Sequence, residues 1–76
     1  MNRLETFFGL KGEATVRYLD GEFQLISAGD FVRCAVTGKP INLDELRYWS
    51  VEYQEAYATP EISYGRLLEL KARAGR

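Results

Sequence analysis

Cys34 is the one residue here with strong nucleophilic or metal-binding chemistry, because the chain has a single cysteine and no histidine. Without histidine, the Ser–His and Cys–His pairs of nucleophilic catalysis cannot form. A structural zinc site takes four Cys or His ligands, and this chain offers one. Cys34 alternates with Val32 and Val36, a pattern that favours a small core side chain, with a reactive thiol as the alternative. We therefore expect no catalytic residues, no metal site and no cofactor.

The turn that follows Cys34 has the outline of a zinc knuckle. Residues 34–41 read Cys-Ala-Val-Thr-Gly-Lys-Pro-Ile, and a zinc knuckle is a hairpin tip of the form Cys-x-x-Cys-Gly-Lys. Gly38 permits the sharp backbone turn that such a tip needs. Cys34 matches the first ligand position, whereas Thr37 stands at the second.

Residues 47–54, Arg-Tyr-Trp-Ser-Val-Glu-Tyr-Gln, resemble the second half of a treble-clef finger, in which a helix begins at the serine. Trp49 and Tyr53 then take the third and fourth ligand positions. The chain thus resembles a treble clef without its metal. That resemblance implies structural roles for Cys34, Gly38, Trp49 and Tyr53.

The chain is also similar to a family of small bacterial proteins, domain of unknown function 2093. The similar run is residues 31–41 followed by residues 43–52, and the turn at residues 18–21 fits as well. The resemblance covers most of the chain. It implies a small bacterial protein and attaches no activity to it.

Length and composition narrow the possibilities further. With 76 residues we expect one domain, residues 1–76, in which residues 1–6 form a loose N-terminal arm. A single cysteine indicates a reducing compartment, the cytoplasm. No apolar run approaches the roughly 20 residues of a membrane span. A net charge of −1 argues against nucleic acid as the main partner.

Three short strands are predicted in the first half of the chain. Residues 14–19 alternate with period two, placing Ala14, Val16 and Tyr18 on one side, and Asp20-Gly21 is a strong hairpin turn signal. The return strand should turn Phe23 and Leu25 inward. The strands are expected at residues 14–19, 22–26 and 31–36, and in series they predict an antiparallel meander.

Two helices are predicted in the second half, which makes the fold class α+β. Ser50 is a candidate N-cap for a short helix over residues 50–58, with a strand as the alternative. Thr59-Pro60 marks the start of a longer C-terminal helix. In that helix Glu69 and Arg73 are spaced as an i, i+4 ion pair, and Ile62 falls on the polar side. Its expected buried stripe comprises Tyr64, Leu67, Leu68, Leu70 and Ala74.

The remaining candidate site is a set of arginines on strands. Arg17, Arg33 and Arg47 each lie opposite a strand's apolar side chains, with Phe31 near Arg33. Arginine beside aromatic rings can stack on bases or clamp anions, although three solvated arginines are the simpler interpretation. We expect a small non-catalytic module that binds another protein, with a nucleic-acid-binding module using this arginine face as the alternative. The sequence leaves the oligomeric state open.

Overall fold

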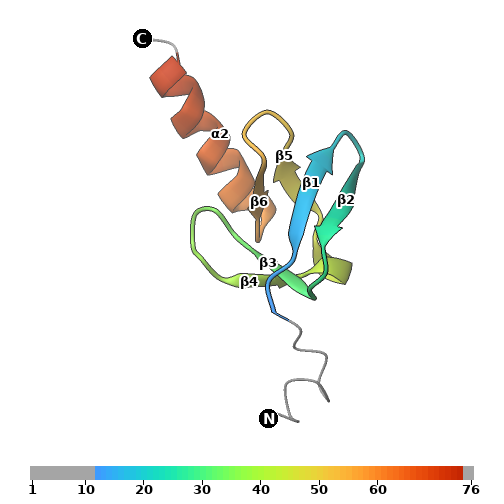
Figure 1. Ribbon diagram of the computed structural model, residues 1–76. Helices are drawn as coiled ribbons and strands as arrows, with labels where there is room; N and C mark the ends of the chain where they lie inside the picture. The colour runs from blue at the N-terminus through green and yellow to red at the C-terminus, as the bar shows by residue number, and fades with distance from the viewer. Residues whose placement is uncertain (1–11, 75–76) are drawn as a thin grey trace.

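The computed structural model describes residues 12–74, which confirm the α+β class with three antiparallel hairpins and one α-helix (Figure 1). The hairpins pair β1 with β2, β3 with β4, and β5 with β6. The β3–β4 hairpin lies across the base of the other two, and α2 runs alongside β6. The predicted loose arm, residues 1–6, lies outside the described residues. The elements are β1 (Thr15–Leu19), β2 (Glu22–Ser27), β3 (Phe31–Arg33), β4 (Pro40–Asn42), the 3-10 turn η1 (Leu43–Glu45), β5 (Tyr48–Ser50), β6 (Glu55–Tyr57) and α2 (Pro60–Ala74).

The first hairpin forms as predicted around Asp20-Gly21, with Leu19 paired to Glu22 across the turn. Tyr18 is buried and Phe23 is half-buried against the core. The inward placement of Leu25 is wrong, because that side chain is 52% exposed. Among residues 12–74, β2 has β1 as its one strand partner, and Phe23 is the one side chain of β2 that is partly buried.

The predicted meander is also wrong, since β3 pairs with β4 and not with β2. The N–H of Ala14 donates to the carbonyl of Phe31 at 2.7 Å, so the segment before β1 takes the edge of β3 that β2 would have used. Gly29 makes this approach possible, because a Cβ there would lie 2.5 Å from the backbone N of Ala14.

The third strand ends at Arg33, earlier than the alternation predicted. Val36 lies in the turn and is 52% exposed, whereas Val32 and Cys34 are buried. The turn is closed by the N–H of Gly38, which donates to the carbonyl of Cys34 at 2.9 Å, and Gly38 has a φ of 76°. This left-handed conformation suits glycine and reverses the chain into β4.

The short helix expected over residues 50–58 is replaced by the β5–β6 hairpin. The Ser50 hydroxyl does accept the N–H of Tyr53 at 3.0 Å, as an N-cap would. The same local bond closes a serine turn, so it does not by itself specify a helix. Gln54 then takes a left-handed φ of 53°, and the chain returns as a strand.

α2 begins as predicted, with Pro60 as its first residue and the Thr59 hydroxyl accepting the N–H of Ile62 at 3.1 Å. The predicted pair of Glu69 and Arg73 forms at 3.0 Å. The predicted buried stripe is wrong, because α2 has no buried residue and three of the large apolar side chains of the stripe are exposed. The exposed fractions are 63% for Tyr64, 49% for Leu67 and 50% for Leu68. Across residues 12–74, no helix is long and apolar enough to span a membrane.

The core is one contiguous cluster beneath the three hairpins. Half-buried residues around it include Phe23, Trp49 and Ile62, so the residue that seemed misplaced in the α2 pattern is the one that packs inward. The buried members of the cluster are Ala14, Tyr18, Val32, Cys34, Ile41, Leu46 and Ala56.

Gln54 joins the β1–β2 hairpin to the β5–β6 hairpin. Its side-chain amide donates to the carbonyl of Tyr18 at 2.9 Å, and its side-chain carbonyl accepts the Tyr18 N–H at 2.9 Å. The amide also donates to the carbonyl of Val51 at 2.7 Å, which holds it in place. One side chain thus makes the two hydrogen bonds that a neighbouring strand would make.

Replacing Gln54 with alanine should destabilise the protein by about 1–3 kcal/mol, because the part-buried Tyr18 backbone loses both partners. Gln54→Glu should be nearly as costly, since a carboxylate of the same size cannot donate. Urea denaturation gives the free energy of unfolding. The control is Gln24→Ala on exposed β2, expected within about 0.5 kcal/mol of the parent. Equal effects at positions 24 and 54 would contradict this assignment.

Candidate functional site

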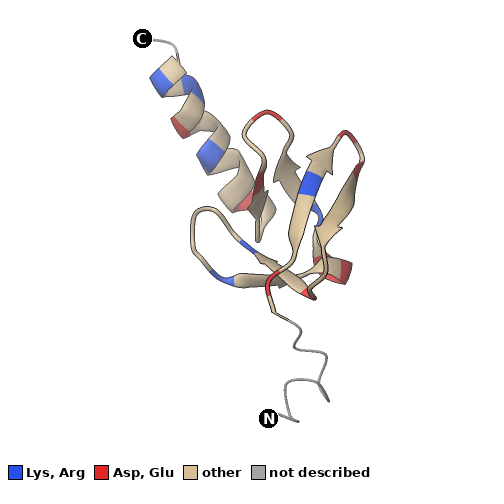
Figure 2. Ribbon diagram, viewed as in Figure 1, with Lys and Arg blue, Asp and Glu red and all other residues tan. Residues whose placement is uncertain are grey.

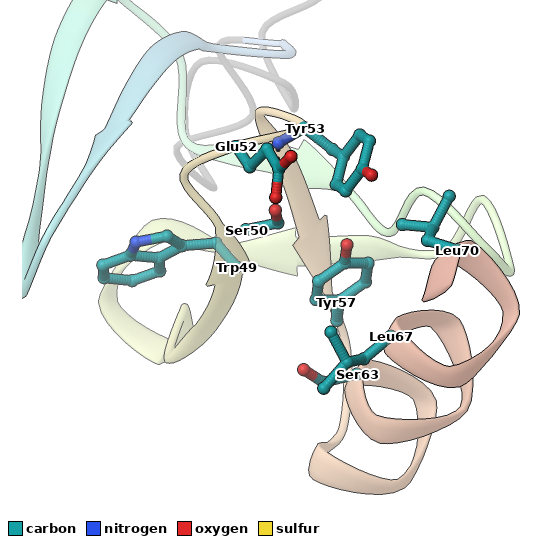
Figure 3. A pocket seen from close by; sticks show the side chains of 8 residues that line it. All are labelled: Trp49, Ser50, Glu52, Tyr53, Tyr57, Ser63, Leu67 and Leu70. Atoms are coloured by element: carbon teal, nitrogen blue, oxygen red, sulfur yellow. Dashed lines mark hydrogen bonds between the residues drawn. The ribbon is translucent and has the colours of Figure 1, made fainter. Parts of the chain in front are cut away.

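The described residues form a cavity of about 220 Å³ between the β5–β6 hairpin and α2 (Figure 3). The rings of Tyr53 and Tyr57 lie on the helix side of the hairpin, whereas the Trp49 indole points away from the helix. The apolar part of the lining on α2 comes from Leu67 and Leu70. The polar part comes from Ser50, Glu52 and Ser63.

A bidentate ion pair between Arg66 and Glu55 connects α2 to this hairpin. The guanidinium donates from Nε to Oε1 at 3.0 Å and from Nη2 to Oε2 at 2.9 Å. The Tyr57 hydroxyl donates to the same carboxylate at 2.9 Å. Arg66 also reaches Glu69 at 3.1 Å, which in turn holds Arg73. About one fifth of each side chain of the Arg66–Glu55 pair is exposed, so the pair lies largely inside the contact between helix and hairpin.

The pKa values of the groups in this network are shifted away from neutral pH. Hydrogen bonds from Arg66, against the opposing effect of burial, lower the pKa of Glu55, and bonds to Glu55 and Glu69 raise the pKa of Arg66. Burial, together with the hydrogen bond to Glu55, raises the pKa of Tyr57 to about 12. A general acid or base works best with a pKa near the operating pH. Arg66 and Glu55 therefore stay charged and paired at neutral pH, and we call this ion-pair network the clamp.

The apolar side of α2 continues from the cavity onto the open surface. Leu67 lines the cavity and is also 49% exposed. Next to it are Tyr64 and Leu68, and Tyr53 is 41% exposed across the cavity. We call Tyr53, Tyr64, Leu67, Leu68 and Leu70 the α2 surface. The helical spacing of the four members on α2 predicts a buried side, whereas Tyr64, Leu67 and Leu68 are exposed.

The arginines predicted as a binding face lie on different parts of the fold. Arg17 is exposed on β1, Arg33 is exposed on β3, and Arg47 is exposed between η1 and β5. Their strands do not pair with one another among the described residues. In Figure 2 the basic segments are spread over the ribbon, and the tips of the β1–β2 and β5–β6 hairpins are acidic. The structure therefore brings together only Phe31 and Arg33.

Arg33 makes three interactions with other residues of the described range, 12–74. Its guanidinium lies 5.2 Å from the centre of the Phe31 ring and donates to the carbonyl of Gly38 at 2.9 Å. Its Nε lies 3.5 Å from a carboxylate oxygen of Glu13. These contacts brace the turn after β3.

Of the residues assigned to the four ligand positions of the treble clef, the first two, Cys34 and Thr37, are in contact. Cys34 is 2% exposed and Thr37 donates its N–H to the Cys34 sulfur at 3.5 Å. Burial alone would raise the pKa of the Cys34 thiol, but hydrogen bonds from the Thr37 side chain and from the backbone of Thr37, Val36 and Ala58 lower it. Residues 12–74 contain no group of three or more Cys, His, Asp or Glu side chains that could hold a metal ion.

Trp49 is placed by the first hairpin. Its Nε1–H donates to the carbonyl of Leu19 at 2.8 Å. Its ring meets Phe23 edge-on at 5.8 Å between centroids and lies 6.0 Å from Tyr18. Tyr53, by contrast, lies in the exposed turn between β5 and β6. Trp49 is therefore a packing residue in the contact between the β1–β2 and β5–β6 hairpins.

Trp49→Ala should destabilise the protein by about 3 kcal/mol, because it removes a large ring and a hydrogen bond together. Trp49→Phe keeps ring contact and should cost about 1 kcal/mol. Tyr53→Ala, at the exposed position, is the control and should cost less than either. Urea denaturation measures all three, and equal losses at positions 49 and 53 would contradict the placement of Trp49.

Tyr57 should make stability fall at high pH. Its pKa is raised in the folded protein, so its contribution is complete below pH 10 and lost as the pH rises through about 12. Tyr57→Phe should therefore reduce the fall in unfolding free energy over that range. Tyr64→Phe, whose ring is 63% exposed, is the control and should leave the fall unchanged. An unaltered pH dependence in Tyr57→Phe would contradict the assignment.

Comparison with known proteins gives one match. A family model described as "Uncharacterized protein conserved in bacteria (DUF2093)" matches residues 25–66, from the middle of β2 into α2. No curated protein matches, and no solved structure matches. The matched residues include the β5–β6 hairpin, the clamp between Glu55 and Arg66, and the start of the α2 surface. Because the match spans more than half of its length, the chain belongs to this family of bacterial proteins.

Proposed function

We propose that this protein is a non-catalytic protein-interaction module that binds its partner through the α2 surface. The observation that carries the proposal is the orientation of α2. The helix turns Arg66 toward the hairpin and leaves Tyr64, Leu67 and Leu68 about half exposed or more. A contiguous patch of exposed apolar side chains typically marks a site of interaction with another molecule.

The clamp supports this interpretation, because it holds the helix in the orientation that exposes the apolar side. Two parallel N–H···O bonds between Arg66 and Glu55 define the rotation of α2 about its axis. Aromatic side chains next to a hydrophobic cavity are typical of the anchor positions of protein interfaces. Tyr53, which is 41% exposed, provides such a ring beside Leu67.

The test is capture of partners from native bacterial lysate by the immobilised protein. Leu68→Glu should reduce capture at least about tenfold, because it puts a charge into an apolar contact. Leu25→Glu is the matched control, since Leu25 is 52% exposed on β2 and Leu68 is 50% exposed on α2. Equal capture by Leu68→Glu and the parent would contradict the proposal.

Nucleic-acid binding is the second candidate, and the pair of exposed Arg33 and half-buried Phe31 favours it, since the guanidinium lies over the ring. Such pairs can stack on bases. Under this alternative, capture would fall steeply with salt, and Arg17→Ser with Arg47→Ser would reduce it. Capture that is unaffected by salt and by these two substitutions supports the apolar interface.

We also propose that the chain is a treble-clef arrangement without metal. Supporting this are the order of a knuckle-like turn, the β5–β6 hairpin and α2, and the bond from the N–H of Ala35 to the carbonyl of Ala56 at 2.8 Å. That bond seats the turn at Cys34 against the end of the second hairpin. In this version the second half of the pattern lies near Ala58, whose backbone bonds to the Cys34 sulfur, instead of at Trp49 and Tyr53.

The purified protein should fold without zinc, because the position opposite Cys34 offers backbone groups and no second thiolate. Elemental analysis should find no stoichiometric metal, and a chelator should leave the melting temperature unchanged. One zinc per chain, with unfolding on chelation, would overturn this part of the proposal.

A further inference from the structure

One line of side chains on α2 has the spacing of a helix–helix contact. Glu61, Tyr64, Leu68 and Lys71 follow one another at intervals of three, four and three residues, which places them on one side of the helix. All four are exposed, and Leu67 lies beside them. The line therefore begins with an acid, ends with a base, and is apolar between the two.

The charges at its two ends are the ones that the helix leaves without an ion pair. Arg66, Glu69 and Arg73 are all joined in the clamp network. Glu61 and Lys71 take part in none of the ion pairs formed within residues 12–74. An acid early and a base late in a helix agree with the helix dipole. The dipole explains the sign of each charge but not why both lie in line with Tyr64 and Leu68.

We propose that the partner of the α2 surface is a second copy of this chain, with the two α2 helices packed antiparallel about a twofold axis. The inference rests on the proposed function and names its partner. In this arrangement Glu61 of each copy faces Lys71 of the other, and Tyr64 faces Leu68. Glu61 and Lys71 are ten residues apart, about 15 Å at the rise of an α-helix, so both ion pairs form in the same register.

The charge pattern selects the antiparallel arrangement over a parallel one. Parallel helices would bring Glu61 onto Glu61 and Lys71 onto Lys71, and like charges would then meet at both ends. The antiparallel arrangement replaces both repulsions with attractions and opposes the two helix dipoles. A twofold contact of this kind uses the same patch on both copies and is closed. It therefore produces dimers and does not extend into larger assemblies.

The contact also covers the cavity at its edge. Leu67 lies between the line of contact and the cavity, and Tyr53 borders the cavity from the hairpin. A helix of 15 residues offers a short seam. The tyrosines and leucines at the cavity extend it toward the roughly 1,000 Å² that a specific interface needs.

Sedimentation equilibrium of the full chain, up to about 1 mM, tests the proposal. The parent should dimerise, Leu68→Glu should be monomeric, and the matched control Leu25→Glu should dimerise like the parent. The dimer dissociation constant should rise about tenfold in Glu61→Lys and in Lys71→Glu, because each substitution replaces two attractions with two repulsions. An equimolar mixture of these two variants should regain dimers, since every 61–71 pair is then of opposite charge.

Helix content from circular dichroism and the emission of Trp49 confirm that each variant is folded. A parent that stays monomeric at every concentration overturns the proposal, as does a dimer that Leu25→Glu disrupts and Leu68→Glu does not. If the parent is monomeric but Leu68→Glu still abolishes capture of another protein, the second copy is ruled out and the proposed function stands. If Leu68→Glu changes neither dimerisation nor capture of another protein, both the dimer and the proposed function are ruled out.

Discussion

The ion pair between Arg66 and Glu55 determines how the C-terminal half of this protein is arranged. A helix with apolar residues on one side would normally turn that side to the core. Here a guanidinium, largely covered and bonded at two points to a carboxylate on β6, occupies the contact. Burying either charge without the other would be strongly unfavourable, so the pair keeps α2 from rotating. Ile62 packs inward on the same side, and the leucines and Tyr64 remain outside.

The rest of the structure is held together by side chains that replace missing strands. Each sheet of the described residues has two strands, and isolated two-stranded hairpins are marginally stable in water. Gln54 bonds to both backbone groups of Tyr18, and Trp49 bonds to the carbonyl of Leu19. Arg33 closes the turn at Gly38 in a similar way. These bonds let three small sheets share one core without forming a continuous ladder.

Much of the first half of the fold could be predicted from local signals. The alternation before Asp20-Gly21, the turn itself and the start of α2 at Pro60 depend on neighbouring residues, and the structure confirms each of them. The pairing of β3 could not be predicted in this way. It depends on the approach of Gly29 to Ala14, a contact that alternation does not encode.

The candidate site could not be predicted from the sequence, because two of its patterns are each compatible with two structures. A serine that accepts the N–H three residues later begins either a helix or a turn, and at Ser50 the left-handed Gln54 decides for the turn. The stripe of leucines in α2 predicted a buried side, yet the ion pair reverses it. The one available sign was Ile62, an apolar residue on the side assigned to solvent. Glu55, the partner that decides the orientation, carries no local signal at all.

The attachment of the first hairpin has a consequence for how freely its sequence can change. Gln54 and Trp49 hold β1 through three atoms of its main chain, the N–H and carbonyl of Tyr18 and the carbonyl of Leu19. Every residue type provides a main-chain carbonyl, and only proline lacks the N–H. Position 19 can therefore exchange its side chain without losing the bond that Trp49 makes there. The family match begins at residue 25, past this hairpin's turn, while both of the residues that grip β1 lie inside it. The joint therefore depends on the side chains of Gln54 and Trp49 and on the main chain of β1.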